Sequence, residues 1–335
     1  MQGEFSNDSF AGKNFDFTGN IDELKLSGER PAGGNLVISK EGKYVMAIYN
    51  KEKSLCAIKE YDKEDDCKVS LPLTGAVKTI TDKNTSGNSE GLFTDDFGNI
   101  RYRGVSPKNY VTFNNEVWRI IGVFNGKVKL IREEGINNTE DASHPIEFQW
   151  DNKTTSNGAE SNYGKNDWST ASAQIYLNTT YYNSLDVISK SMIAEVKYNL
   201  GGIITADIDK KAIYELERGT IVYTGRPTEW TGRIGLMYLS DYGYAASEEC
   251  TETLNNYSNT ICRNNDWLYK SAYHQWTMTS RSNMSSHVAY VSYNGYASGI
   301  NAGYYWPSLR PVLYLNSSVQ ITGGEGTIAS PYLLQ

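Results

Sequence analysis

The stretch VWRIIGVFNGKVKLI, residues 117–131, decides the fold prediction for this chain. Two runs rich in Val and Ile flank Asn125-Gly126, which is the strongest short signal for a two-residue hairpin turn. β-Branched side chains favour pleated, half-buried strands. We therefore expect antiparallel strands over residues 117–123 and 127–131.

More strands are expected on either side of this hairpin. Apolar runs at 100–103 and 110–113 precede it, and runs at 275–279, 288–292 and 310–315 come near the end of the chain. Their short length and β-branched or aromatic content are typical of strands. We expect Trp118, Trp276, Leu313 and Leu315 to lie in the core.

Helices are expected between the two groups of strands. One begins near Ser169, whose hydroxyl can cap it, and ends near residue 178. A second covers about 185–199 and ends at Gly201-Gly202, and a third covers 209–218 and ends at Gly219. In the second helix the apolar residues are spaced for one buried stripe, which comprises Val187, Ile188, Met192, Ile193 and Val196.

The domain prediction has three parts. Residues 1–73 form a small β-rich domain, with strands at 35–38, 44–49 and 56–59 around the turn Glu41-Gly42-Lys43. Residues 74–98 are rich in turn formers without apolar periodicity, which predicts a linker. Residues 99–335 form the second domain, with mixed strands and two or three helices. The predicted fold class is therefore α+β.

Composition excludes some classes of partner. The net charge is -7 without a basic cluster, which argues against nucleic acid as a partner. No run of about 20 apolar residues occurs, so we expect no direct membrane insertion by these residues. The 25 tyrosines, together with many Asn, Ser and Thr, favour strands and polar surfaces.

The four cysteines lie in two local pairs. Cys56 and Cys67 flank one polar loop, and Cys250 and Cys262 flank another. Four cysteines allow three pairings, and we favour Cys56–Cys67 with Cys250–Cys262 over four separate buried thiols, because both loops are too polar for a core. Disulfides indicate an oxidising, extracellular location.

Catalytic and metal-binding motifs are poorly represented. The chain has no calcium loop and no zinc spacing of cysteines. His144, His274 and His287 each stand in a context without obvious catalytic partners. We therefore predict no enzyme activity, no cofactor and no metal.

A polar and aromatic segment near the C-terminus is the candidate ligand-binding region. Tyr provides a large, rigid contact area, and Ser and Asn provide adaptable hydrogen bonds. The alternative is an ordinary wet β-surface in a chain that is rich in Tyr and Asn throughout. The candidate residues are Ser282, Asn283, Ser285, Ser286, His287, Tyr290, Ser292, Tyr293, Asn294, Tyr296, Ser298, Asn301, Tyr304 and Tyr305.

Several spaced motifs carry a resemblance to a known family. They are Val117–Ile121, Trp168-Ser169, Ile234–Ser240, Trp276–Ser280, Arg310–Leu315, Ile321–Thr327 and Pro331-Tyr332. Together they resemble an extracellular domain of gut Firmicutes, and the late strands are similar to the end of the C-type-lectin-like and formylglycine-generating-enzyme-like fold. The N-terminal domain resembles the globular part of type IV pilin-like proteins.

This resemblance implies an extracellular, cell-surface adhesin or receptor that binds a protein or glycan. The 282–305 segment also resembles the variable region of proteins diversified by retroelements, with Trp276, Gly295, Arg310 and Pro311 as its fixed frame. Two alternatives stay open. One is a structural pilus or cell-envelope subunit that associates with itself, and the other is an enzyme of the formylglycine-generating type.

Overall fold

The structure is a computed structural model. It describes residues 75–86, 90–152 and 163–335 in full, and within the first 73 residues it describes strand backbone alone. The chain divides into two compact units, Met1–Leu73 and Thr74–Gln335.

The first unit contains one antiparallel sheet. Its strands are β1 (Gln2–Phe5), β2 (Asn14–Thr18), β3 (Lys25–Ser27), β4 (Gly34–Lys40), β5 (Lys43–Tyr49) and β6 (Leu55–Tyr61), in the order β3-β2-β1-β4-β5-β6. Strands β4 and β5 pair up to Lys40 and Lys43, on either side of the expected turn. The predicted Cys56–Cys67 disulfide lies outside the described residues.

The larger sheet of the second unit surrounds the hairpin that the sequence predicts. Its central path has the order β14-β19-β11-β10-β9-β21-β20, with β8 pairing β10 and β7 pairing β8. These strands are β7 (Leu92–Thr94), β8 (Ile100–Tyr102), β9 (Tyr110–Phe113), β10 (Glu116–Phe124), β11 (Lys127–Arg132), β14 (Ile234–Gly235), β19 (Val312–Tyr314), β20 (Ile321–Gly323) and β21 (Tyr332–Leu334).

The turn between β10 and β11 has the predicted geometry. Asn125 and Gly126 both have positive φ, 48° and 69°, as a two-residue hairpin turn of type I′ requires. Strand pairing runs from Phe124↔Lys127 to Trp118↔Arg132. The predicted hairpin is therefore confirmed.

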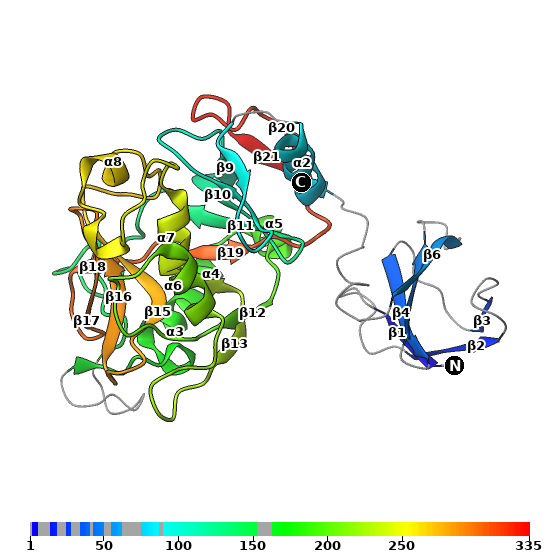
Figure 1. The fold of residues 1–335 in the computed structure, drawn as a ribbon, viewed down its shortest axis with the longest axis horizontal. Coiled ribbons are helices and arrows are strands. Elements are labelled where there is room, and N and C mark those ends of the chain that lie inside the picture. Colours follow the sequence, from blue (N-terminus) through cyan, green and yellow to red (C-terminus); the bar gives the residue numbers. More distant parts are fainter. Residues whose placement is uncertain are drawn as a thin grey trace. The chain divides into compact units, whose positions relative to one another are not determined.

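A smaller sheet has the order β17-β16-β15-β18, and its strands are β15 (His274–Ser280), β16 (His287–Val291), β17 (Ala297–Asn301) and β18 (Pro307–Ser308). Strands β12 (Val196–Asn199) and β13 (Glu229–Gly232) form a separate pair. Figure 1 shows helices α6 and α7 near β15 in this unit.

Short helices complete the unit, which is a mixture of helices and strands, as predicted. The α-helices are α2 (Gly75–Thr85), α3 (Ser172–Tyr176), α4 (Tyr182–Ser184), α5 (Val187–Met192), α6 (Lys210–Glu217), α7 (Leu239–Ala245) and α8 (Thr260–Arg263). Helix α6 confirms the prediction for 209–218, and the carboxylate of Asp209 caps it by accepting from the backbone N–H of Lys211 and Ala212.

The segment predicted as a linker, residues 74–98, contains helix α2 and strand β7. Ala76, Val77 and Ile80 are buried in the core of the second unit. The backbone N–H of Ala76 donates to the carbonyl of Val319 at 2.8 Å. The linker interpretation is therefore wrong for residues 75–85 and 92–94. It is based on the turn-forming residues at 83–91, which overlap the end of this short helix.

The prediction of one helix over 185–199 is also wrong for the second half of this segment. Helix α5 ends at Met192, and Val196–Asn199 becomes strand β12. Val187 and Ile188 are 82% and 70% exposed rather than buried, whereas Ile193 is buried. Pairing of β12 with β13 overrides the local helical periodicity.

The first predicted helix begins differently from the expectation. Asp167, not Ser169, supplies the cap, because its side chain accepts from the backbone N–H of Ser169. A turn of 3₁₀-helix at Trp168–Thr170 precedes α3, and a π-helical turn at Leu177–Tyr181 follows it.

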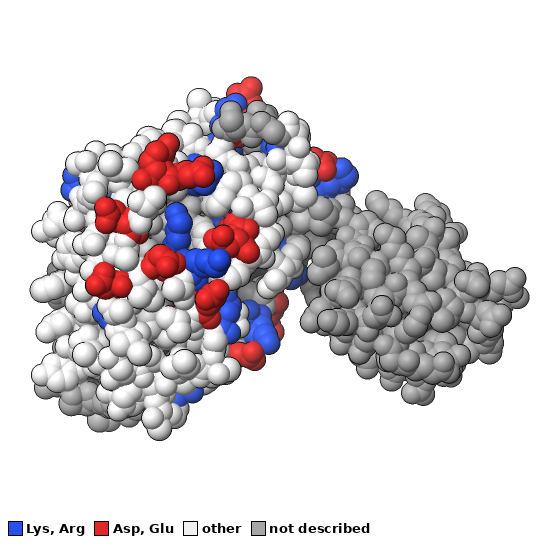
Figure 2. Space-filling view, in the orientation of Figure 1, with Lys and Arg blue, Asp and Glu red and all other residues white. Residues whose placement is uncertain are grey.

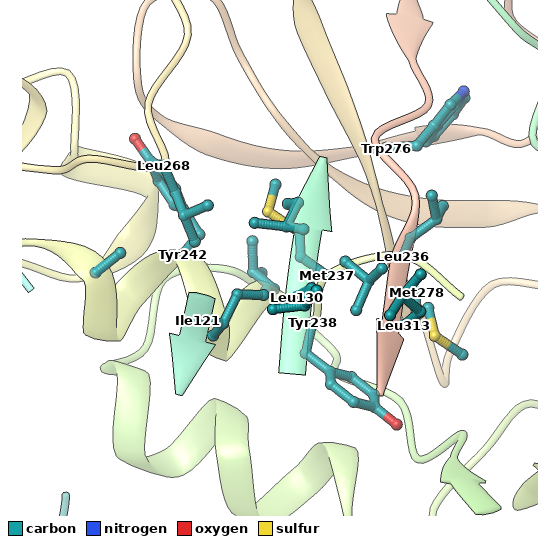
Figure 3. Packing of buried hydrophobic residues seen from close by; sticks show 14 of the residues in the cluster. Ile121, Leu130, Leu236, Met237, Tyr238, Tyr242, Leu268, Trp276, Met278 and Leu313 are labelled. Carbon is teal, nitrogen blue, oxygen red and sulfur yellow. The ribbon is translucent and has the colours of Figure 1, made fainter. Parts of the chain in front are cut away.

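The core of the second unit joins residues from both sheets and from α7. Trp118, Trp276, Leu313 and Leu315 are buried, as predicted. Figure 3 shows Leu130 and Leu313 packed near Leu236–Tyr238. The predicted Cys250–Cys262 disulfide is present and buried, which confirms that pairing. Among the described residues, no helix is long and apolar enough to cross a bilayer.

Candidate ligand-binding surface

Four aromatic side chains form a continuous row at one end of the smaller sheet. We call His274, Tyr293, Tyr304 and Trp306 the aromatic surface. The ring centroids of Tyr304 and Trp306 are 5.5 Å apart with an interplanar angle of 11°. The row continues from Trp306 to His274 at 6.2 Å and from His274 to Tyr293 at 4.7 Å. Tyr304, Tyr293 and Trp306 are 43%, 47% and 55% exposed.

Strand pairing brings these residues together from distant parts of the chain. Strand β18 runs parallel to β15 with His274 opposite Pro307, so Trp306 comes next to His274. Tyr293 lies in the turn that follows β16, and the backbone N–H of this turn residue donates to Nδ1 of His274 at 3.3 Å. The rigid sheet thus positions side chains that belong to three separate segments.

The buried ring of Tyr290 supports the aromatic surface. Tyr290 is buried and contacts the ring of His274 at 5.4 Å and that of Tyr296 at 6.5 Å. Burial raises the pKa of the Tyr290 hydroxyl well above its usual range, so this side chain is neutral at physiological pH. Edge-on ring contacts of this kind stabilise a fixed geometry.

The turn that carries Tyr293 is held by two further tyrosines. The hydroxyl of Tyr242, from α7, donates to the carbonyl of Gly295 at 2.7 Å. The hydroxyl of Tyr269 donates to the carbonyl of Tyr293 at 2.7 Å. Gly295 has φ of 96°, a conformation that favours glycine. One buried and one exposed hydrogen bond therefore stabilise this turn.

His274 is neutral in this arrangement. Burial lowers the pKa of its imidazole, and its Nδ1 accepts the hydrogen bond from Tyr293, which requires an unprotonated nitrogen at that position. A neutral ring next to Trp306 keeps the aromatic surface uncharged.

The fourteen residues predicted for ligand binding do not form one exposed face. The prediction that their side chains face the solvent is wrong for three of them, because Ser286, Tyr290 and Ser292 are buried. Four are exposed, namely Asn283, Tyr293, Asn294 and Tyr304. The remaining seven are half-buried: Ser282, Ser285, His287, Tyr296, Ser298, Asn301 and Tyr305.

Some of these residues lie away from the ring contacts of the aromatic surface. His287 and Asn301 face each other at the opposite end of the β16–β17 pair from the Tyr293 turn. There the hydroxyl of Ser286 donates to Oδ1 of Asn301 at 3.0 Å. Tyr305 instead stacks on His144 with 4.0 Å between ring centroids. The candidate segment therefore supplies several local neighbourhoods, and the aromatic surface contains its two exposed tyrosines, Tyr293 and Tyr304.

Two members of the aromatic surface were not among the predicted binding residues. Trp306 directly follows Tyr304-Tyr305, and this run of three aromatic residues was a usable signal. His274 precedes Trp276 by two residues on β15, but nothing in the sequence shows that β18 brings Trp306 beside it.

The described ranges 75–86, 90–152 and 163–335 contain no group of three or more His, Cys, Asp or Glu side chains that could hold a metal ion. The Cys250–Cys262 disulfide also means that these two residues do not present a pair of free thiols. Comparison of the chain with family models, with curated proteins and with solved structures finds no match.

Proposed function

We propose that this protein is a binding protein whose aromatic surface receives a protein or glycan ligand. The observation that carries the proposal is the exposed pair of nearly parallel rings of Tyr304 and Trp306, extended by His274 and Tyr293. Contiguous apolar patches on a soluble protein mark interaction sites more often than isolated apolar residues do.

Physical properties of the rings favour binding over catalysis. Tyr and Trp offer large contact areas at low entropic cost, and both are enriched where proteins recognise ligands. Their electron-rich faces also attract the polarised C–H groups of sugar rings. Because the supporting strands hold the rings before any ligand arrives, little ordering entropy is lost on binding.

The proposed setting is the cell surface of a bacterium, with the protein acting as an adhesin or receptor. The disulfide between Cys250 and Cys262 supports an oxidising compartment. We also propose that the second domain is C-type-lectin-like and the first domain pilin-like. This part of the proposal is based on the sequence motifs that carry the resemblance.

Binding to immobilised glycans and mucins, followed by biolayer interferometry of each positive ligand, tests this proposal. We expect Trp306→Ala to weaken binding by about tenfold or more, because a buried interface aromatic contributes about 2 kcal/mol or more when truncated. Met284→Ala is the matched control, since Met284 is also exposed but precedes β16, at the opposite end of that strand from the Tyr293 turn. Equal binding by both variants and the wild type would sink the proposal.

Self-association through the same surface is the alternative, and it corresponds to a structural pilus or cell-surface subunit. Sedimentation velocity of the wild type and of Trp306→Ala separates the two functions. A wild-type oligomer that Trp306→Ala converts to monomer, without any glycan or protein ligand, would replace the receptor proposal with the structural one.

A further inference from the structure

A polar cleft in the second unit shares no residue with the aromatic surface. It has a volume of about 340 Å³, at the small end of the range of about 300–1,000 Å³ that is common for ligand pockets. The turn between β10 and β11, strand β12, the end of α6 and strand β19 contribute to its walls.

Arg218 is the charged side chain held inside the wall of this cleft. Its guanidinium carbon is 3.5 Å from the ring centroid of Tyr214 and 4.5 Å from that of Tyr238. Both tyrosines also line the cleft. These ring contacts fix the position of Arg218. The N–H groups at the edge of its planar guanidinium stay free of the rings and can donate hydrogen bonds.

One edge of the guanidinium is already used. Nη1 of Arg218 donates to Oε2 of Glu217 at 3.0 Å and lies 3.5 Å from the Tyr214 carbonyl and the Ser240 hydroxyl. Within the described residues, the side-chain hydrogen bonds of Arg218 all leave from Nη1. Nε and Nη2 are the donors that remain for a molecule in the cleft.

Glu217 holds this arrangement independently of any ligand. Its buried carboxylate accepts from the backbone N–H of Ser240, from the Ser240 hydroxyl and from the Thr279 hydroxyl, in addition to Arg218. Because these donors come from α7 and β15, the carboxylate stays fixed when the cleft is empty. Arg218 is thus preorganised for a second anionic partner.

The rim adds two ion pairs and Lys127 to the charge of the cleft. Lys197 pairs with Glu229 at 2.9 Å, and Glu195 pairs with Arg233 at 2.9 Å, in exposed positions. Exposed pairs of this kind contribute little energy. Figure 2 shows acidic and basic side chains interspersed on the face that it presents. A general attraction for polyanions is therefore not expected, and the specific donor edge of Arg218 decides what binds.

We propose that this cleft binds a small organic carboxylate of about the size of a monosaccharide acid. The carboxylate accepts from Nε and Nη2 of Arg218 in the bidentate geometry that a guanidinium fork favours. The ring edges of Phe124, Tyr238 and Tyr314, which line the cleft, contact the carbon skeleton. This site is separate from the aromatic surface and does not depend on the proposed function.

Isothermal titration of the full chain with D-glucuronate and with N-acetylneuraminate tests the proposal, and glucose and inorganic phosphate are titrated for comparison. We expect at least one of the two sugar acids to bind saturably, with glucose and phosphate at least tenfold weaker. Arg218→Lys keeps the charge but loses the fork, and it should weaken the carboxylate at least tenfold. Lys211→Gln removes a cation from an exposed position on the same helix and should leave the affinity unchanged.

Three outcomes would overturn the assignment. The first is that neither acid binds the wild type. The second is that phosphate binds as tightly as the sugar acids. The third is that binding persists in Asn199→Trp, which fills the cleft and leaves the Glu217–Arg218 pair intact, so this variant decides the matter if Arg218→Lys fails to fold. Trp306→Ala should bind the carboxylate normally, which keeps this test independent of the aromatic surface.

Discussion

The hydroxyl of Tyr242 donates to the carbonyl of Gly295 at 2.7 Å, and this bond connects the buried helix α7 to the exposed turn that carries Tyr293. Tyr242 is fully buried, so the bond lies in a medium where an unsatisfied carbonyl is costly. The aromatic surface therefore depends on a residue that no ligand would touch.

Tyr242→Phe should destabilise the protein by about 1–3 kcal/mol, because the Gly295 carbonyl loses its buried donor. Tyr269→Phe removes a bond of the same length to the Tyr293 carbonyl, but at an exposed position where water can replace it. Urea unfolding should show a clearly smaller shift for Tyr269→Phe. Equal shifts for the two variants would contradict the importance assigned to the buried bond.

Gly295→Ala should also be destabilising, for a reason that concerns the backbone. Gly295 has φ of 96°, and a Cβ there would lie 2.9 Å from the Tyr257 carbonyl oxygen. Gly126→Ala is the matched control, because Gly126 has φ of 69° with open space around its Cβ position. The control should cost about 1–2 kcal/mol from the left-handed conformation alone, and thermal unfolding should show a larger loss for Gly295→Ala.

Asp241 is the centre of a buried ion cluster and gives a pH-dependent prediction. Its carboxylate pairs with Lys129 and, at 3.0 Å, with Arg101, all in fully buried positions. Burial alone would raise the pKa of Asp241, but these two cations lower it to about 2. Because the pKa of this acid is depressed in the folded state, its stabilisation is complete above about pH 4 and is lost as the pH falls towards 2.

Asp241→Asn should therefore cost about 3–5 kcal/mol at pH 7, since it leaves buried cations without their partner. The difference from the wild type should narrow below pH 4, because there the unfolded wild-type chain binds a proton at Asp241 that the folded chain, with its pKa of about 2, does not bind. Urea unfolding at pH 7 and pH 3 measures both effects. A difference that stays constant between these pH values would show that the Asp241 charge contributes nothing to stability.

The β10–β11 hairpin could be predicted because its signals are local. The turn residues Asn125-Gly126 and the flanking β-branched runs all favour the same structure, and the structure follows them. Residues 185–199 could not be predicted in the same way, because Val196 pairs with Gly232 on a strand far along the chain. No periodicity within the segment contains that information.

The candidate site divides along the same line. Tyr290 and Tyr293 are the same residue type three positions apart, yet one is buried on β16 and the other is exposed in the turn after it. Composition predicts a binding role for both residues equally. Their exposure differs because β16 ends at Val291, between them. Trp306 joins the site through the parallel pairing of β18 with β15, a non-local contact that the sequence does not reveal.

His274 gives a last prediction, which concerns the aromatic surface and needs no ligand. Burial lowers the pKa of its imidazole, so folding favours the neutral ring. The resulting stabilisation is present above the ordinary His pKa of about 6.5 and is lost as the pH falls below it. Protonation of Nδ1 would also remove the acceptor for the Tyr293 backbone N–H.

The Tyr293 amide should therefore lose protection from hydrogen exchange at acid pH, after correction for the intrinsic pH dependence of exchange. His274→Gln keeps an acceptor but does not titrate in this range, so its protection should stay constant. The interpretation fails if the wild type and His274→Gln show the same pH profile, because the Tyr293 turn would then not depend on the charge of His274.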